Sequence, residues 1–310
     1  MDLVEGVLGG DPRAIARAIS MVEDGAEGLE DLSAGLFPHT GRAWTVGLTG
    51  SPGVGKSTLA GELVRAARER ERSVAVLAID PTSPFTGGAL LGDRVRMQAH
   101  ATDPAVFIRS MATRGHLGGM ALAAPEAVRI LDASGRDLIV VETVGVGQAE
   151  VDVAAATDTT LVVVAPGWGD HVQAAKAGIL EIADVFVVNK ADREGAEAAA
   201  RDLRQMIRMG PPAEWTPPVV STAAADGEGV DGLWAAIEDH RVHLEDRGEV
   251  TERRHLRLVR EVEGLASEQL RGRIREALER DAELAADLVE RRVDPYRAAA
   301  ILVERAPSSD

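Results

Sequence analysis

The chain has 310 residues, long enough for about two domains with a sizeable core. Its 34 lysines and arginines are outnumbered by 50 aspartates and glutamates, and the formal net charge of −16 argues against a general basic surface for nucleic acid or anionic membranes. No cysteine is present, so disulfides, thiolate metal sites and cysteine nucleophiles are excluded. The acidic first residues lack a signal pattern and no apolar run reaches membrane length, so we expect a soluble, cytoplasmic protein.

The chain is expected to comprise a helical lead (1–42), a central domain (43–245) and a helical arm (246–310). The central region alternates amphipathic helical stretches with short apolar runs. These runs span 44–48, 74–79, 138–141, 161–165, 185–188 and 219–220. Because they are nearly continuous in apolar residues, they are typical of parallel strands buried on both faces. The alternation predicts an α/β fold with a doubly wound, mainly parallel sheet, whose ligands bind beyond the carboxyl ends of the strands.

The two flanking regions are predicted to be helical. In the lead, Asp11-Pro12 starts a helix that places Ile15 and Ile19 one turn apart on one face. In the arm, apolar residues recur every three or four positions and would form one stripe. They are Leu256, Val259, Val262, Ala266, Leu270, Ile274 and Leu278. From this pattern alone, an arm that packs on its own domain and a dimerisation arm are equally open.

The most specific motif is Gly50-Ser51-Pro52-Gly53-Val54-Gly55-Lys56-Ser57, which matches the P-loop pattern G-x-x-x-x-G-K-[ST]. It follows an apolar run and opens a helix that continues through Thr58. The glycines let backbone N–H groups surround a phosphate, and the helix N-terminus adds partial positive charge. Lys56 is expected to reach the β- and γ-phosphates of a nucleotide, and Ser57 to offer its hydroxyl to Mg²⁺.

A second motif, Asn189-Lys190-Ala191-Asp192, follows the apolar run 185–188. The Asp192 carboxylate can accept hydrogen bonds from the N1–H and the exocyclic amine of guanine, whereas adenine would leave this carboxylate partly unpaired. Ser221-Thr222-Ala223, just after the last run, could close over the edge of the base. Together with the P-loop, this motif predicts GTP and GDP rather than adenine nucleotides as ligands.

Acidic residues also follow the apolar runs. Asp80 ends the run 74–79, Glu142 ends the run 138–141, and Asp93 lies in a glycine-rich stretch. Carboxylates, often acting through water, are typical ligands of a divalent ion on a nucleotide. Gly145, three residues after Glu142, is expected to meet the γ-phosphate with its backbone and to act as a switch.

The seven histidines are not expected to form a metal site. Only His240 and His243 are close enough to share a helical face, and the absence of cysteines or acidic ligands beside them predicts a solvated surface pair. Gln148 is a candidate for orienting the attacking water, because a glutamine does so in other GTPases. No residue is an obvious hydrolytic base, so we expect slow intrinsic hydrolysis that a partner stimulates.

These motifs resemble those of the MeaB/ArgK family of P-loop GTPases, whose human member is MMAA and which act as chaperones of adenosylcobalamin-dependent methylmalonyl-CoA mutase. The resemblance covers nearly the whole chain. Its specific stretches are 47–58, 79–88, 92–97, 108–111, 114–119, 141–148 and 189–192. It implies a P-loop NTPase fold of the SIMIBI type with helical N- and C-terminal extensions, and a homodimer formed through the C-terminal arm.

The resemblance also implies roles for single residues. Asp80, Asp93 and Glu142 would surround Mg²⁺. The stretch 169–176 looks like a third switch, in which Lys176 would move toward the phosphates and Asp170 would take part in coupling to the mutase. The expected catalytic residues are therefore Lys56, Glu142, Asp170 and Lys176. The expected nucleotide-binding residues are Gly50, Ser51, Pro52, Gly53, Val54, Gly55, Lys56, Ser57, Thr58, Gly145, Asn189, Lys190, Asp192, Ser221, Thr222 and Ala223.

The implied function is to bind the mutase and to use GTP binding and hydrolysis to gate loading of intact cofactor and release of damaged cofactor. In the third switch, Trp168 and His171-Val172 depart from the family pattern, which leaves open another acyl-CoA mutase as partner. Neither nucleic acid nor a membrane is an expected partner.

Two alternatives remain. A nickel-insertion GTPase would share the fold, but its metal site needs cysteine and histidine. A kinase would need a preference for ATP, which Asn189-Lys190-Ala191-Asp192 opposes.

Overall fold

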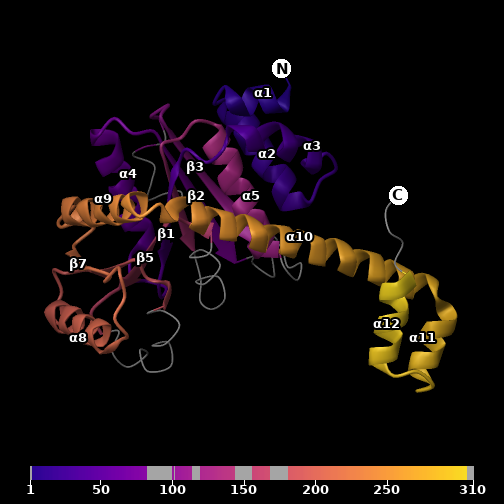
Figure 1. Cartoon of the computed structure of the whole chain (residues 1–310). Coiled ribbons are helices and arrows are strands. Elements are labelled where there is room, and N and C mark those ends of the chain that lie inside the picture. Colours follow the sequence, from indigo (N-terminus) through magenta and orange to yellow (C-terminus); the bar gives the residue numbers. More distant parts are fainter. Residues whose placement is uncertain are drawn as a thin grey trace. The chain divides into compact units, whose positions relative to one another are not determined.

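The computed structural model describes residues 2–81, 100, 102–113, 119–143, 156–167 and 181–305 (Figure 1). Its strands are β1 (Trp44–Thr49), β2 (Val74–Pro81), β3 (Val106–Thr113), β4 (Leu138–Thr143), β5 (Thr159–Val164), β6 (Val185–Asn189) and β7 (Val219–Thr222). The first helices are α1 (Leu3–Leu8), α2 (Pro12–Asp24), α3 (Leu29–Leu36), a 3₁₀ turn (Phe37–His39), α4 (Lys56–Glu69) and α5 (Gly119–Ala133). They are followed by α8 (Ala196–Met209), α9 (Val230–Asp246), α10 (Glu249–Arg280), α11 (Ala282–Val289) and α12 (Pro295–Arg305).

The strands form one parallel sheet in the order β3-β2-β4-β1-β5-β6-β7. Every residue of β1, β4, β5 and β6 is buried, as the continuous apolar runs predicted. This arrangement confirms the predicted α/β fold with a doubly wound parallel sheet. Strand β3 was missed, because Arg109 and Ser110 interrupt its apolar pattern and it lies at the edge of the sheet.

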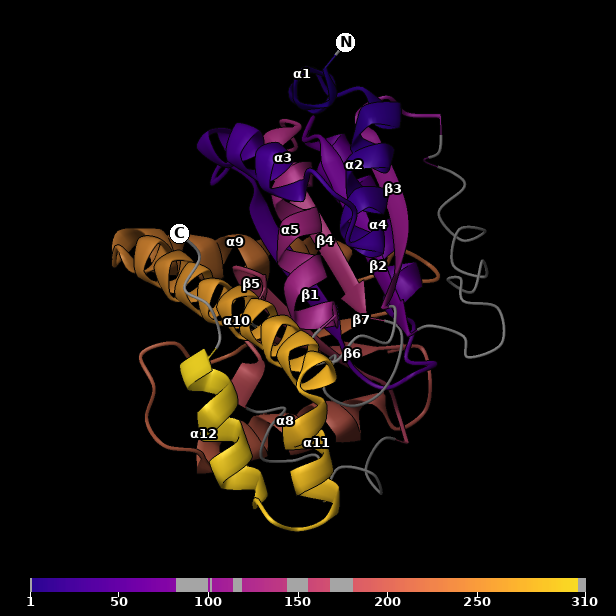
Figure 2. The ribbon, with the colours of Figure 1, turned by 90° about the vertical axis from the view of Figure 1, so that its right-hand side faces the viewer.

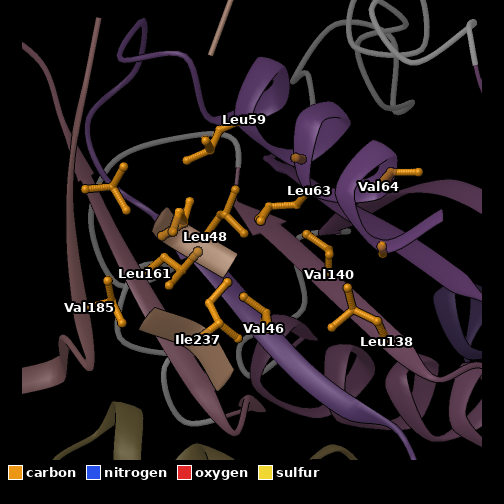
Figure 3. Packing of buried hydrophobic residues seen from close by; sticks show 14 of the residues in the cluster. Val46, Leu48, Leu59, Leu63, Val64, Leu138, Val140, Leu161, Val185 and Ile237 are labelled. Carbon is orange, nitrogen blue, oxygen red and sulfur yellow. The ribbon is translucent and has the colours of Figure 1, made fainter. Parts of the chain in front are cut away.

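Helices cover both faces of the sheet. Helices α4 and α9 pack on one face, where Leu59 and Leu63 of α4 contact Val46, Leu48 and other inward side chains of the strands (Figure 3). On the other face, α5 and the N-terminal helices cover β2, β3 and β4, and α8 covers β5 and β6 (Figure 2). These three apolar clusters remove both faces of the central strands from water, which is the main driving force for this architecture.

The N-terminal helices contribute to the hydrophobic core on one face of the sheet. Ile15 and Ile19 of α2 are fully buried against α5 and the strands, as their spacing predicted. Asp11 caps α2 by accepting a hydrogen bond from the backbone N–H of Arg13 at 3.1 Å. The linker after α3 is fixed by Asp132 of α5, whose carboxylate accepts the N–H of Ala43 at 2.9 Å.

The chain divides into two compact units, residues 1–257 and 258–310. In the second unit, α11 and α12 form a small core with the end of α10, built on Leu284, Ala298 and Leu302. Part of the predicted stripe of α10 joins this core, whereas Val259, Val262 and Leu270 are exposed. The boundaries expected at residues 42/43 and 245/246 stay predictions. None of the helices in the described ranges combines the length and apolarity needed to cross a membrane.

Candidate functional site

The P-loop connects β1 to α4 at the carboxyl edge of the sheet. Its three glycines, Gly50, Gly53 and Gly55, have φ angles of 135°, 78° and 98°, in the region that favours glycine. A Cβ built on Gly50 would lie 2.1 Å from the carbonyl oxygen of Val163 in β5, so this position admits no side chain. The loop therefore runs directly against β5 and leads its backbone into the first turn of α4.

Lys56 and Ser57 form the first turn of α4, and both are buried. The Lys56 ammonium donates to the carbonyl oxygens of Gly50 at 2.5 Å and Ser51 at 3.1 Å, which holds its charge over the loop. The partial positive charge at the start of α4 and this ammonium together provide a positive cradle. Such a cradle fits a phosphate group.

A pair of oxygen ligands lies beside the cradle. The Ser57 hydroxyl donates to Oε1 of Glu142 in β4 at 2.6 Å, and both side chains are buried. Hydroxyl and carboxylate oxygens are ligands that Mg²⁺ prefers, so these residues fit the ion that accompanies a nucleotide. Asp80 lies near the carboxyl end of β2, two positions beyond Ala78, which pairs with Glu142 in the sheet register. The backbone thus brings Asp80 to the same edge of the sheet.

The Asn189-Lys190 pair at the end of β6 is bonded directly to the P-loop. The Asn189 amide donates to the carbonyl oxygen of Val54 at 2.9 Å, and the Lys190 ammonium donates to that of Gly53 at 2.5 Å. A Cβ built on Gly55 would lie 2.4 Å from the Asn189 amide nitrogen. The two motifs, which are about 135 residues apart in the chain, therefore form one continuous structure.

The end of β7 and the residues that follow it hold the Asn189 side chain in place. The Thr222 hydroxyl and the backbone N–H of Ala224 both donate to the amide oxygen of Asn189 at 3.1 Å. Asp192 and Ser221 are exposed, whereas Thr222 is buried. Thr222 thus holds Asn189 rather than presenting its side chain outward. Ala224 was not predicted from the sequence, because it acts through its backbone N–H, which every residue type except proline supplies.

Several predicted site residues cannot be placed. Asp93, Gly145, Gln148, Asp170 and Lys176 lie outside the described residues, as do Trp168 and His171-Val172. Their roles stay predictions.

The prediction for His240 was wrong. His240 is fully buried rather than solvated: its Nδ1 lies 2.9 Å from the Thr159 hydroxyl and its Nε2 lies 3.1 Å from Oδ1 of Asp184. Its ring also packs against Trp215, with centroids 4.9 Å apart. His243 is half-buried against the same tryptophan. The partners of His240 lie in β5 and directly before β6, far from it in the sequence, and helical spacing cannot reveal them.

Comparison with known proteins places the chain in one family. Residues 15–279 match the family model described as methylmalonyl-CoA mutase-associated GTPase MeaB. A relative from Pyrococcus abyssi, whose name assigns it to the GTPases, is 47 % identical over 98 % of this chain and 95 % of its own. GTPase ArgK of Escherichia coli is 37 % identical over 77 % of this chain and 75 % of its own.

A further relative and a solved structure are also similar to this chain. The methylmalonic aciduria type A homologue, mitochondrial, of Caenorhabditis elegans is 34 % identical over 81 % of this chain and 68 % of its own. A crystal structure described as a LAO/AO transport system kinase covers 97 % of this chain and 95 % of its own, with a TM-score of 0.72 and 25 % identity. Because the family model spans most of the sequence and the Pyrococcus abyssi relative aligns along nearly all of it, this protein belongs to the MeaB family of GTPases.

Proposed function

We propose that this chain binds GTP and GDP with Mg²⁺ at the joined P-loop and Asn189-Lys190 segment, and that it hydrolyses GTP there. The observation that carries this proposal is the pair of hydrogen bonds from Asn189 and Lys190 to P-loop carbonyl oxygens. These bonds fix Lys190 to the P-loop, and Asp192, whose carboxylate is exposed, follows two residues later. A phosphate in the cradle and a guanine at Asp192 are then two ends of one ligand.

Each part of the site has a proposed task. Lys56 and the backbone N–H groups of the P-loop bind and orient the phosphates, since positive groups fixed before the reaction need no reorganisation when charge moves. Ser57, Glu142, Asp80 and Asp93 are proposed to hold Mg²⁺ directly or through water. When bound, the ion neutralises charge on the β- and γ-phosphates.

The remaining residues are proposed on the family pattern. Gly145 would meet the γ-phosphate, and Asp170 and Lys176 would belong to a switch that responds to a partner. Asp192, Ser221, Thr222 and Ala223 would enclose the base, with Thr222 acting through Asn189.

The proposed partner is an adenosylcobalamin-dependent acyl-CoA mutase, and methylmalonyl-CoA mutase is the first candidate. The family description, which names association with methylmalonyl-CoA mutase, supports it. The name of the Caenorhabditis elegans relative refers to methylmalonic aciduria, which points to the same metabolism. We propose that GTP binding and hydrolysis gate cofactor loading and protection of the mutase, and that the chain acts as a homodimer.

Turnover measurements test this proposal. The purified full-length chain is assayed for phosphate release from GTP and from ATP, alone and with the methylmalonyl-CoA mutase of the same source. We expect slow hydrolysis of GTP alone, and a rise of about tenfold or more with the mutase, the size of a typical coupling between sites. Lys56→Ala, assayed in parallel, controls for contaminating phosphatases.

The outcomes separate the parts of the proposal. GTP hydrolysis without stimulation, and without mutase binding at micromolar concentration, would remove the chaperone role and leave the nucleotide site. A preference for ATP would contradict the guanine assignment and favour the kinase alternative.

A further inference from the structure

A buried aspartate joins β1 and β5 at the amino edge of the sheet, opposite the candidate site. Asp158 comes directly before β5 and is only 2 % exposed. Its Oδ2 accepts the backbone N–H of Thr45 in β1 at 3.1 Å. Its own N–H donates to the carbonyl oxygen of Thr45 at 2.9 Å and to the Thr45 hydroxyl at 2.7 Å. These bonds fix the register of β1 against β5.

Two arginines from the start of α10 neutralise this aspartate. Arg254 donates to Oδ1 of Asp158 at 3.1 Å and to Oδ2 at 2.8 Å, and Arg257 donates to Oδ1 as well. Burial by itself would raise the pKa of Asp158, but the hydrogen bond from Arg254 and the nearby charge of Arg257 lower the pKa overall. Asp158 therefore remains an anion whose counter-charges all come from α10 among the residues described.

The same arrangement is repeated one strand further along the sheet. Asp184 comes directly before β6, and its Oδ2 accepts the backbone N–H of Thr160 in β5 at 2.8 Å. Its Oδ1 lies 3.2 Å from Arg253 of α10 and 3.1 Å from the ring of His240. Arg253, Arg254 and Arg257, which we call the α10 foot, thus contact the aspartates that join β1, β5 and β6.

These three strands carry the candidate site at their other ends. Strand β1 leads into Gly50, which lies against Val163 of β5 with no room for a side chain. Strand β6 ends at Asn189, which donates to the P-loop carbonyl of Val54. The spacing of the site loops therefore depends on the register of the strands that the α10 foot holds.

We propose that the α10 foot controls nucleotide affinity: separation of its arginines from Asp158 and Asp184 weakens binding of the nucleotide at the site. This inference rests on the nucleotide site of the proposed function. Coupling between sites is reciprocal, so nucleotide binding must in turn stabilise the α10 foot. The helix itself continues beyond the foot to Arg280, which belongs to the second unit.

A third aspartate provides an internal comparison. Asp137 comes directly before β4 and accepts the backbone N–H and the hydroxyl of Ser73, both at 2.7 Å, which joins β4 to β2 in the same way. The charges that lower its pKa come from Arg72 and Arg136, and neither belongs to α10. Asp137 therefore has the strand-joining role without the link to α10.

The test compares GDP affinity in full-length variants with Mg²⁺ present, by calorimetry well below the melting temperature. Arg254→Gln/Arg257→Gln removes the centre of the α10 foot. Its matched control is Arg271→Gln/Arg280→Gln, which removes two exposed ion pairs further along the same helix. Arg253→Gln, at a half-exposed position, is a milder variant that should fold even where the double variant does not. Hydrogen exchange of the wild type, with and without GDP, needs no variant.

We expect the double variant to bind GDP about tenfold more weakly than the wild type and Arg253→Gln a few-fold more weakly, with the control within about twofold. GDP should also slow exchange of the amides around 250–257 in the wild type, which a merely structural role of the foot does not require. Equal GDP affinity in the Arg253 variant, the double variant and the control, with unchanged exchange in α10, would overturn the inference. Absence of GDP binding by the wild type would instead overturn the proposed function on which it rests.

Discussion

The two edges of the sheet are held together in opposite ways. At the carboxyl edge, the loops are joined by bonds to backbone carbonyl oxygens, as between Asn189 and Val54. At the amino edge, the strands are joined by buried carboxylates that arginines neutralise, as between Asp158 and Arg254. The carboxyl edge therefore presents an ammonium over the P-loop and the exposed carboxylate of Asp192, whereas the buried carboxylates of the amino edge form ion pairs with arginines.

The two edges should therefore be sensitive to different kinds of substitution. Contacts to backbone carbonyls depend on close approach of the chain, so the carboxyl edge should be sensitive to any added atom. Breaking a buried ion pair leaves an uncompensated charge, so the amino edge should be sensitive to loss of charge and to pH. The four predictions that follow test the two edges separately.

The largest effect is expected for Lys56→Ala. The substitution removes the ammonium that is held over the P-loop, and GTP hydrolysis should fall by on the order of 10³-fold, as when a fixed electrostatic contact to developing charge is lost. Phosphate release under saturating GTP measures this, with circular dichroism as a control for folding. A variant that keeps its rate within about threefold would show that the P-loop is not the site of chemistry.

The next effect concerns base selection. Asp192→Asn replaces two acceptor oxygens by one acceptor and one donor group, and GTP affinity should fall by on the order of 10²-fold. Affinity for XTP should rise, because xanthine presents a carbonyl oxygen where guanine presents its amine. Competition binding measures both, and Asp202→Asn, an exposed aspartate of α8, is the matched control. Unchanged GTP affinity in Asp192→Asn would separate this residue from the base.

Close packing at the carboxyl edge is tested by two glycines that share a positive φ. Gly50→Ala would place a Cβ 2.1 Å from the Val163 carbonyl, whereas Gly41→Ala meets nothing within 4 Å. The backbone strain alone should cost about 1–2 kcal/mol in each, and the clash should add about 2 kcal/mol or more in Gly50→Ala. Urea unfolding measures the difference. Equal losses would show that the loop does not lie against β5.

The smallest effect is a pH dependence at the amino edge. The pKa of Asp158 is lowered in the folded protein, so its ion pairs contribute stability above its unfolded pKa of about 3.9 and lose that contribution as the pH falls through the folded pKa. As the pH falls from 5 through the folded pKa, Asp158→Asn should therefore lose less stability than the wild type. Asp231→Asn, in an exposed pair with Arg70, should follow the wild type. Parallel curves for all three would contradict the role given to Asp158.

Much of the fold followed from local sequence. The central strands are continuous apolar runs, and the P-loop and the Asn189-Lys190 segment are contiguous motifs that end two of these runs. Strand β3 escaped detection because an edge strand is covered less completely and tolerates Arg109 within it. Local pattern thus sufficed wherever both faces of an element are buried.

Contacts between distant segments could not be read from the sequence. The hydrogen bond that joins Asn189 to Val54 spans 135 positions, and the one that joins Arg254 to Asp158 spans 96. In the sequence, the arginines of the α10 foot are indistinguishable from the other arginines of a charged helix. His240 was misjudged for the same reason, since Thr159 and Asp184 reach it only in the folded sheet.

The most direct test of the joined site is a titration of the purified chain with GDP and with ADP in the presence of Mg²⁺. If the P-loop and Asp192 hold two ends of one guanine nucleotide, GDP should bind at least about 10³-fold more tightly than ADP, since a site built to pair with a polar group rejects a base that lacks it. Equal affinity for the two nucleotides would show that the P-loop and Asp192 do not form one site selective for guanine.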